Sequence, residues 1–344
     1  MKARSGLIKL TKSGLYCAAG DFYIDPWQPV KRAVVTHAHA DHAYRGSDNY
    51  LVTREGEKLY RIRLGFDANL EMMSYGETRS INGVNVSFHP AGHVLGSAQV
   101  RVEHKGEIWC VSGDYKLAPD PTCAAFEPVE CHNLITEATF GLPIYRWQDT
   151  RKIAEDINDW WRRNREQDKA SILCAYALGK SQRLLALIDS SIGKIFTHGS
   201  TQRLNEAYRE SGVNLPDTTY AKAVEKKSEF PGSLIVAPPS ALGSTWIKRF
   251  GKISTAFASG WMIVRGARRR KAVDRGFVVS DHADWEELQT AVKESKAETV
   301  FVTHGYIEEF VRWLNENGYN AKPLKTQYVG YEDESEELRA ESGE

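Results

Sequence analysis

The sequence has few cysteines, and none of them stands in a metal-binding or disulfide pattern. Its five cysteines are Cys17, Cys110, Cys123, Cys131 and Cys174, and no two of them are separated by only two residues. An odd, unpatterned set indicates reduced thiols and argues against both a disulfide framework and a cysteine-bound zinc site. We therefore expect a cytoplasmic protein.

Long apolar runs are missing as well. Apolar runs such as Ile108–Val111 and Leu234–Ala237 are only a few residues long and fall far short of the roughly 20 residues that cross a bilayer. The first residues, Met1–Leu15, lack the apolar stretch of a signal peptide. Neither a membrane protein nor a repeat architecture is expected. With 344 residues, 42% of them hydrophobic and 26% charged, the chain is predicted to be globular, with two domains or one domain that carries a large insertion.

Net charge is also absent, but the charges are unevenly distributed. Positions 331–344 carry seven acidic residues and one arginine, a net charge of minus six, so the other 330 residues carry plus six. We expect this acidic tail to be a solvated, disordered end. The densest basic run contains a single aspartate, Asp274, and the cations Arg265, Arg268, Arg269, Arg270, Lys271 and Arg275. Such a run is either a solvated face or a site for a nucleic-acid backbone.

Secondary-structure signals divide the chain into two patterns. Up to about residue 148, short β-branched or apolar runs such as Ala33–Thr36, Ala98–Glu103 and Leu134–Glu137 predict strands. Further along, amphipathic helical stretches such as Thr150–Arg165 alternate with strands such as Ser171–Tyr176. Because alternating strands and helices form parallel sheets, we predict an α/β protein with a β/α domain in its middle.

The strongest chemical signal is a His-x-His-x-Asp-His string directly after the predicted strand Ala33–Thr36. It contains His37, His39, Asp41 and His42, and a string of this kind arises by chance at about one start in a million. Alternate residues of an extended loop point the same way, so His37 and His39 can bind one metal ion. Asp41 and His42 are then expected to face a second ion, and such ligands suit Zn²⁺ or Mn²⁺.

Two later segments supply further ligands of the same kind. His93 stands between glycines just after a predicted strand, and Asp114 follows a glycine at the end of the next one. A carboxylate at a strand end is well placed to bridge two metal ions. In this order after the histidine string, the two segments predict a catalytic metal site.

Together these motifs resemble the metallo-β-lactamase superfamily, and the downstream half resembles its nucleic-acid-processing branch, the β-CASP nucleases. That branch contains Artemis-like DNA nucleases, RNase J and the factor that cleaves messenger RNA at its 3′ end. The segments Thr136–Gly141, Ser280–Asp284 and Val302–Gly305 resemble its three further motifs. The resemblance implies an α/β fold, a metallo-β-lactamase αββα sandwich with an inserted β-CASP parallel β/α domain. The implied boundaries are 1–143 and 272–330 for the two parts of the metallo-β-lactamase domain, 144–271 for the insertion and 331–344 for the tail.

The resemblance also implies two divalent metal ions, Zn²⁺ or Mn²⁺, and assigns their ligands. The first ion would be bound by His37, His39, His93 and Asp114. The second would be bound by Asp41, His42, His304 and the shared Asp114. Asp25, after the strand-like Phe22–Ile24, resembles an early aspartate that supports the metal loop.

Further roles follow for catalysis and for substrate binding. The resemblance implies that His282, oriented by Glu137, protonates the leaving oxygen, and that Asp41 also takes part in catalysis. Lys180 and Ser181 open a predicted helix just after a glycine, where free N–H groups favour a phosphate; an ordinary turn with a solvated lysine is the alternative. Arg268, Arg269 and Arg270 are expected to hold the substrate backbone. Structural or surface roles are expected for the remaining histidines, among them His89, His104, His132 and His198.

Three functions are compatible with this set of residues. The first is a phosphodiesterase that cleaves nucleic acid with a hydroxide activated by two metal ions. The second, a small-molecule metallo-hydrolase of the same fold, is disfavoured by the inserted domain, by Glu137 and His282, and by the basic run. The third is an inactive binding paralogue, which is disfavoured because every ligand position is filled.

Two features bear on the choice between DNA and RNA. A histidine at the third late motif, here His304, is typical of RNA-processing members. The segments Phe257–Trp261 and Arg268–Lys271 resemble instead a bacterial subgroup of ligase-associated or helicase-associated DNA exonucleases of repair operons. We predict a DNA-repair exonuclease whose partners include a DNA ligase or helicase of the same system, with an RNA-processing exo- or endoribonuclease as the alternative.

Overall fold

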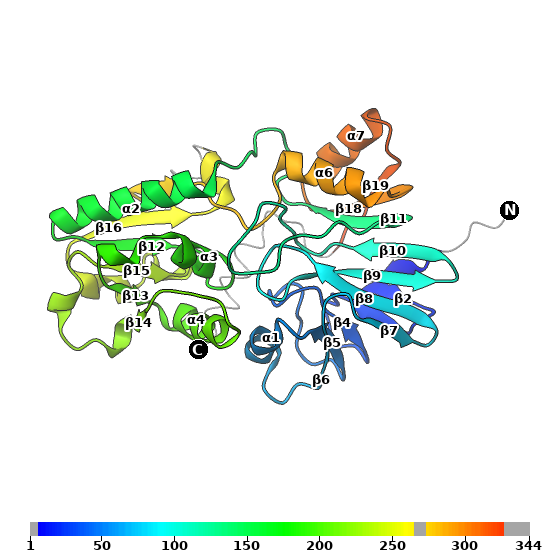
Figure 1. Cartoon of the computed structure of the whole chain (residues 1–344), viewed down its shortest axis with the longest axis horizontal. Coiled ribbons are helices and arrows are strands. Elements are labelled where there is room, and N and C mark those ends of the chain that lie inside the picture. Colours follow the sequence, from blue (N-terminus) through cyan, green and yellow to red (C-terminus); the bar gives the residue numbers. More distant parts are fainter. Residues whose placement is uncertain (1–5, 265–272, 327–344) are drawn as a thin grey trace. The chain divides into compact units, whose positions relative to one another are not determined.

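The computed structural model describes residues 6–264 and 273–326. The chain is an α/β protein that divides into two compact units (Figure 1). One unit contains the described residues up to Ile144 and those from His282 onward, and the other extends from Tyr145 to Asp281. The arginines at 268–270 and the acidic tail lie outside the described residues. Within the described ranges, the helices are all too short or too polar to span a bilayer.

The first unit contains two sheets. The strands of the first sheet follow chain order: β1 (Ile8–Thr11), β2 (Gly14–Cys17), β3 (Phe22–Ile24), β4 (Ala33–Val34), β5 (Tyr50–Thr53) and β6 (Leu70–Met73). Its first three strands are antiparallel and the rest run parallel from β3 onward. Helix α1 (Glu57–Leu64) follows β5 and buries Leu59, Tyr60 and Leu64.

The second sheet has the order β19-β18-β11-β10-β9-β8-β7. Its strands are β7 (Thr78–Ile81), β8 (Val84–Pro90), β9 (Ala98–His104), β10 (Glu107–Val111), β11 (Asn133–Ala138), β18 (Thr299–Gly305) and β19 (Ala321–Pro323). Strands β7 to β10 form an antiparallel meander, and β10, β11, β18 and β19 are parallel. Two helices accompany this sheet, α6 (Trp285–Ser295) and α7 (Ile307–Glu316).

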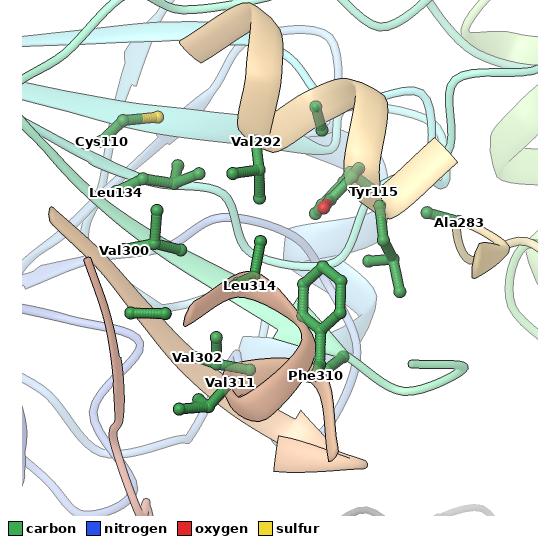
Figure 2. Close-up of a cluster of buried hydrophobic side chains, with 14 of the residues drawn as sticks. Cys110, Tyr115, Leu134, Ala283, Val292, Val300, Val302, Phe310, Val311 and Leu314 are labelled. Atoms are coloured by element: carbon green, nitrogen blue, oxygen red, sulfur yellow. The ribbon is translucent and has the colours of Figure 1, made fainter. Parts of the chain in front are cut away.

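Strand alternation gives the second sheet two buried faces. Successive side chains of a strand point to opposite faces, and neighbours such as Leu134 and Ile135 accordingly belong to different cores. The Ile135 face packs against the first sheet, with residues such as Ile24 and Val100 from the two sheets in one cluster. The Leu134 face packs against α6 and α7, where Figure 2 shows Val292, Phe310 and Leu314 gathered over the strands. The unit is therefore layered as sheet, sheet and helices.

The second unit is built on a parallel sheet of order β14-β13-β15-β12-β16-β17. Its strands are β12 (Ala170–Cys174), β13 (Ile195–Thr197), β14 (Thr219–Tyr220), β15 (Leu234–Ala237), β16 (Ile253–Ala258) and β17 (Arg275–Phe277). Its α-helices are α2 (Thr150–Glu166), α3 (Lys180–Leu187) and α4 (Gly199–Glu210). Short 3-10 helices occupy Ser190–Ile192, Ala221–Ala223, Lys227–Glu229, Pro239–Ala241, Thr245–Phe250 and Gly260–Ile263.

The end of the inserted unit differs from the boundary expected at residue 271. Strand β17 pairs in parallel with β16, so the chain stays in the second unit until Asp281. The physical reason is that β17 completes the sheet of this unit as an additional edge strand. The segment 272–281 was expected to belong to the first unit.

Candidate metal centre

Strand ends of the first unit bring the predicted metal ligands together. The histidine string follows β4, His93 follows β8, Asp114 follows β10, and His304 lies near the end of β18. Strands β8, β10, β11 and β18 run in the same direction, so their carboxyl ends meet at one edge of the second sheet. Residues distant in sequence therefore converge there.

The first cluster consists of His37, His39, His93 and Asp114, all of them buried. His39 Nδ1 lies 3.1 Å from His37 Nε2 and 3.2 Å from His93 Nε2. Asp114 Oδ2 lies 3.5 Å from His37 Nε2 and 3.9 Å from His93 Nε2. Tetrahedral ligands at the usual zinc–nitrogen distance would be about 3.3 Å apart. The separations fit a single transition-metal ion.

The second cluster consists of Asp41, His42 and His304. His42 Nε2 lies 3.5 Å from Asp41 Oδ2 and also 3.5 Å from Asp114 Oδ2. Within the described residues, Asp41 Oδ1 and His42 Nε2 are buried without a hydrogen-bond partner. Buried polar atoms are nearly always paired, so these two atoms fit the ligands of a cation. Asp114 Oδ2 is close to both clusters, as the sequence predicts for a shared ligand.

His304 is placed by an irregularity between β11 and β18. Glu137 pairs with Thr303 and Ala138 pairs with Gly305, so His304 is the extra residue of a β-bulge. Its φ of 56° lies in the left-handed region, which a non-glycine residue seldom adopts. Bulges re-aim side chains beside functional sites, and this one directs His304 to the second cluster.

Asp25 contacts the segment of the histidine string, whose support the resemblance assigns to it. Its carboxylate accepts hydrogen bonds from the Thr36 backbone N–H at 2.8 Å and from the Thr36 hydroxyl at 2.6 Å. It also lies 2.7 Å from His42 Nδ1. Because the carboxylate engages Nδ1, the other ring nitrogen of His42 faces the second cluster. The sequence assigns no role to Thr36, but its hydroxyl oxygen lies 3.0 Å from His37 Nδ1.

A glycine lets two of these loops approach each other. A Cβ on Gly113, which has a φ of +57°, would lie 2.7 Å from the Thr36 Cβ. A side chain there would push Asp114 away from the histidine string. Gly113 is therefore required by close packing as well as by backbone conformation.

Burial and neighbouring charges shift the ligand pKa values in different directions. Burial, helped by the adjacent histidines, holds the pKa of His37 well below its usual range. Burial also lowers the pKa of His304, to about 4. Burial opposes protonation of His42 too, but the carboxylates of Asp41, Asp114 and Asp25 outweigh it and raise its pKa well above normal. Burial raises the pKa of Asp114 to about 7.

His282 lies beside the first cluster and is held by Glu137. Its Nδ1 is 3.1 Å from both carboxylate oxygens of Glu137 and 4.0 Å from Asp114 Oδ2. Glu137 also accepts a hydrogen bond from the Tyr115 backbone N–H at 2.9 Å. Burial would raise the pKa of Glu137, but His282 outweighs burial and lowers it. A carboxylate thus orients the imidazole.

The predicted substrate-binding residues at the start of α3 have partners inside the second unit. The Lys180 ammonium lies 3.1 Å from Asp281 Oδ1, and both side chains are buried. The Ser181 hydroxyl donates to the Tyr176 carbonyl at 2.7 Å. The contacts with a substrate phosphate that the sequence suggests for both residues stay a prediction.

The remaining histidines have local contacts. His132 Nδ1 accepts a hydrogen bond from the Ile108 backbone N–H at 3.0 Å. The His198 side chain caps α4 by accepting from the Ser200 backbone N–H. His89 lies 3.1 Å from the Ser87 hydroxyl, and His104 lies 3.1 Å from the Gly83 carbonyl. These contacts agree with structural or surface roles.

Comparison with known proteins identifies curated relatives. A probable DNA ligase of Opitutus terrae is 31% identical over 311 residues, which cover 90% of this chain and 30% of that protein. An RNase J-like protein of Methanocaldococcus jannaschii is 28% identical over 207 residues, 56% of this chain and 47% of that one. Cleavage and polyadenylation specificity factor 73 of Drosophila melanogaster is 27% identical over 176 residues, 48% of this chain and 25% of that one. The chain thus spans less than half the length of each of these relatives.

A solved structure shares the fold. A protein of unknown function from Enterococcus faecalis superposes with a TM-score of 0.55 at 12% sequence identity, over 87% of this chain and 80% of that one. No family model matches the chain. The curated relatives and the order of the motifs nevertheless agree with the resemblance. The chain belongs to the β-CASP branch of the metallo-β-lactamase superfamily.

Proposed function

We propose that the chain is a metal-dependent nuclease that hydrolyses phosphodiester bonds of DNA, as an exonuclease in DNA repair. The observation that carries the proposal is the convergence of seven His and Asp side chains in two adjoining clusters, with His282 and Glu137 beside them. We further propose that the two units are a metallo-β-lactamase sandwich and an inserted β-CASP domain. We place the activity in the cytoplasm, in keeping with five cysteines, all in the described residues, that form no disulfide.

Two metal ions, Zn²⁺ or Mn²⁺, fit the clusters. Three histidines and Asp114 would hold the first ion, and Asp41, His42, His304 and the shared Asp114 would hold the second. When bound, ions of this kind stabilise charge on the phosphate oxygens and provide the nucleophile from water. In this arrangement Asp41 would act in catalysis as a ligand. By engaging Nδ1 of His42, Asp25 leaves the Nε2 atom facing Asp41 and Asp114, where it would bind the second ion.

His282 would protonate the leaving oxygen. Glu137 engages Nδ1 through both carboxylate oxygens, which leaves Nε2 as the nitrogen that can deliver a proton. The alkoxide that leaves a phosphodiester is strongly basic, and a positioned acid typically contributes about 10²–10⁴-fold to the rate. The proton therefore passes from His282 Nε2 to the leaving oxygen.

The choice of DNA is supported by how much of the chain each relative covers. The relative that covers 90% of the chain is a probable DNA ligase, whereas the RNase J-like protein and the cleavage factor cover about half. A DNA ligase or helicase of the same repair system is accordingly our proposed partner. RNA processing is the second candidate, because His304 is present and several relatives are endoribonucleases by name. We also propose that the three arginines at 268–270 bind the nucleic-acid backbone.

The test uses single-stranded DNA and RNA of one sequence, each labelled at the 5′ end in one set and at the 3′ end in another. The metal-loaded protein is expected to shorten the DNA progressively and to cleave the RNA more slowly. The control is Asp114→Asn, which should be inactive on both. Preferential cleavage of RNA would replace the proposal by its alternative, and no cleavage of either polymer by metal-loaded protein would refute the nuclease function.

A further inference from the structure

Two cations of helix α3 contact the residues that directly precede His282. Lys180 Nζ lies 3.1 Å from Asp281 Oδ1, with 6% and 3% of the two side chains exposed. Arg183 is 2% exposed, and its Nη1 donates to the Ser280 carbonyl at 2.9 Å. Residues three apart on a helix share a face. One face of α3 therefore holds both residues of the Ser280–Asp281 pair.

The start of α3 is itself fixed by internal hydrogen bonds. The Gln182 side chain accepts from the Gly179 backbone N–H at 2.8 Å and donates to the Ala177 carbonyl at 2.9 Å and to Asn205 Oδ1 at 2.8 Å. The Lys180 ammonium also lies 4.3 Å from the centre of the Tyr176 ring. Lys180 is thus held between an aromatic ring and a carboxylate.

The chain is anchored again directly after His282. The Ala283 backbone N–H donates to the Tyr115 carbonyl at 2.6 Å. Asp284 caps α6 and exchanges hydrogen bonds with Glu287 in a capping box. His282 is therefore a single residue between two fixed segments, and its imidazole is also held by Glu137.

We propose that Lys180 and Arg183 are positioning residues that fix the backbone before His282 and so aim its imidazole at the leaving oxygen. The inference rests on the proposed nuclease function. Burying an ion pair removes two charges from water and often brings no net stability, so a geometric role accounts for the Lys180–Asp281 pair better than a stabilising one. A misplacement of about 1 Å at a reacting group can cost about 10²-fold in rate.

The test compares two substrates that differ in their need for an acid. DNA has a poor leaving group, whereas bis(4-nitrophenyl) phosphate has a leaving group that needs little protonation. Lys180→Met is expected to lower kcat for DNA about 10–100-fold, with KM unchanged, and to affect the activated diester much less. His282→Ala should show the same pattern more strongly. Lys194→Met is the matched control, because its ion pair with Glu229 at 2.8 Å is exposed and lies in the same unit.

A second variant separates positioning from folding. Lys180→Met removes a buried positive charge beside the Asp281 carboxylate, whereas Lys180→Met/Asp281→Asn removes both charges of the pair at once. This double variant should fold and bind metal normally, yet keep the selective loss on DNA. Recovery of the wild-type rate on DNA in the double variant would overturn the inference. A raised KM with unchanged kcat would also overturn it, since Lys180 would then be a substrate contact.

Failure of the inference is distinguishable from failure of the proposed function. If His282→Ala shows the leaving-group dependence and Lys180→Met does not, the positioning role is refuted and the nuclease proposal stands. If His282→Ala slows both substrates equally with metal retained, the acid role of His282 is refuted, and the positioning inference fails with it.

Discussion

Replacing Asp25 with asparagine is expected to weaken the second metal cluster more than the first. The carboxylate contacts His42 directly at 2.7 Å, whereas it reaches His37 only through the Thr36 hydroxyl. Asparagine has nearly the same shape and tolerates the left-handed φ of 43° at this position. The change therefore removes the charge and leaves the backbone unstrained.

The magnitude follows from the role of such a contact. Loss of a partner that orients a metal-bound histidine typically costs 10–100-fold in metal affinity, which corresponds to about 1.4–2.8 kcal/mol. The amide oxygen of asparagine can still accept the hydrogen bond from the Thr36 backbone N–H. The first cluster, which Asp25 reaches through the Thr36 hydroxyl, should lose less than the second.

The assay is a titration of chelator-stripped protein with Zn²⁺ in the presence of a competing chromogenic chelator. The wild type should show two binding events, and Asp25→Asn should weaken one of them selectively. Asp21→Asn is the control. The Asp21 carboxylate is exposed and accepts a hydrogen bond from the Tyr16 hydroxyl, far in sequence from the metal ligands. Equal weakening of both events, or no change in either, would refute the proposed role of Asp25.

Three further outcomes are expected. Metal binding should release protons and weaken as the pH falls through about 7. The pKa of His42 is raised and that of Asp114 is about 7, so both groups hold protons that an ion must displace. Calorimetry in buffers of different ionisation enthalpy measures this release, and its absence would contradict the prediction. Glu137→Gln should reduce DNA cleavage less than His282→Ala does, with metal content retained, since it orients the acid without touching substrate; single-turnover rates give the comparison. Alanine at all three positions of Arg268–Arg270 should weaken DNA binding and lower the salt slope by about 0.7–0.9 for each lost phosphate contact; an unchanged slope in a folded variant would show a solvated face.

The metal clusters could be predicted from sequence because their chemistry is concentrated in short segments at strand ends. Four of the seven residues lie in the string from His37 to His42, and the others follow predicted strands. The end of β4 was less predictable. The strand was expected to extend to Thr36, but the Thr36 N–H donates to the Asp25 carboxylate and not to a neighbouring strand, and β4 ends at Val34.

Contacts between distant segments could not be read from the sequence. A lysine after a glycine at a helix start indicates a phosphate site when it is solvated, and nothing near Lys180 in sequence indicates that Asp281 is its partner. The C-terminal end of the inserted unit could not be read from the sequence for the same reason. Strand β17 is only three residues long, and its assignment depends on parallel pairing with β16.

Cleavage of end-labelled single-stranded DNA as a function of bound Mn²⁺ tests the central claim most directly. Chelator-stripped protein should be inactive, and its activity should rise until two ions are bound per chain. Asp114→Asn, which removes the charge shared by both clusters, should neither retain two ions nor recover activity. Full cleavage by metal-free protein, or by Asp114→Asn, would contradict the account.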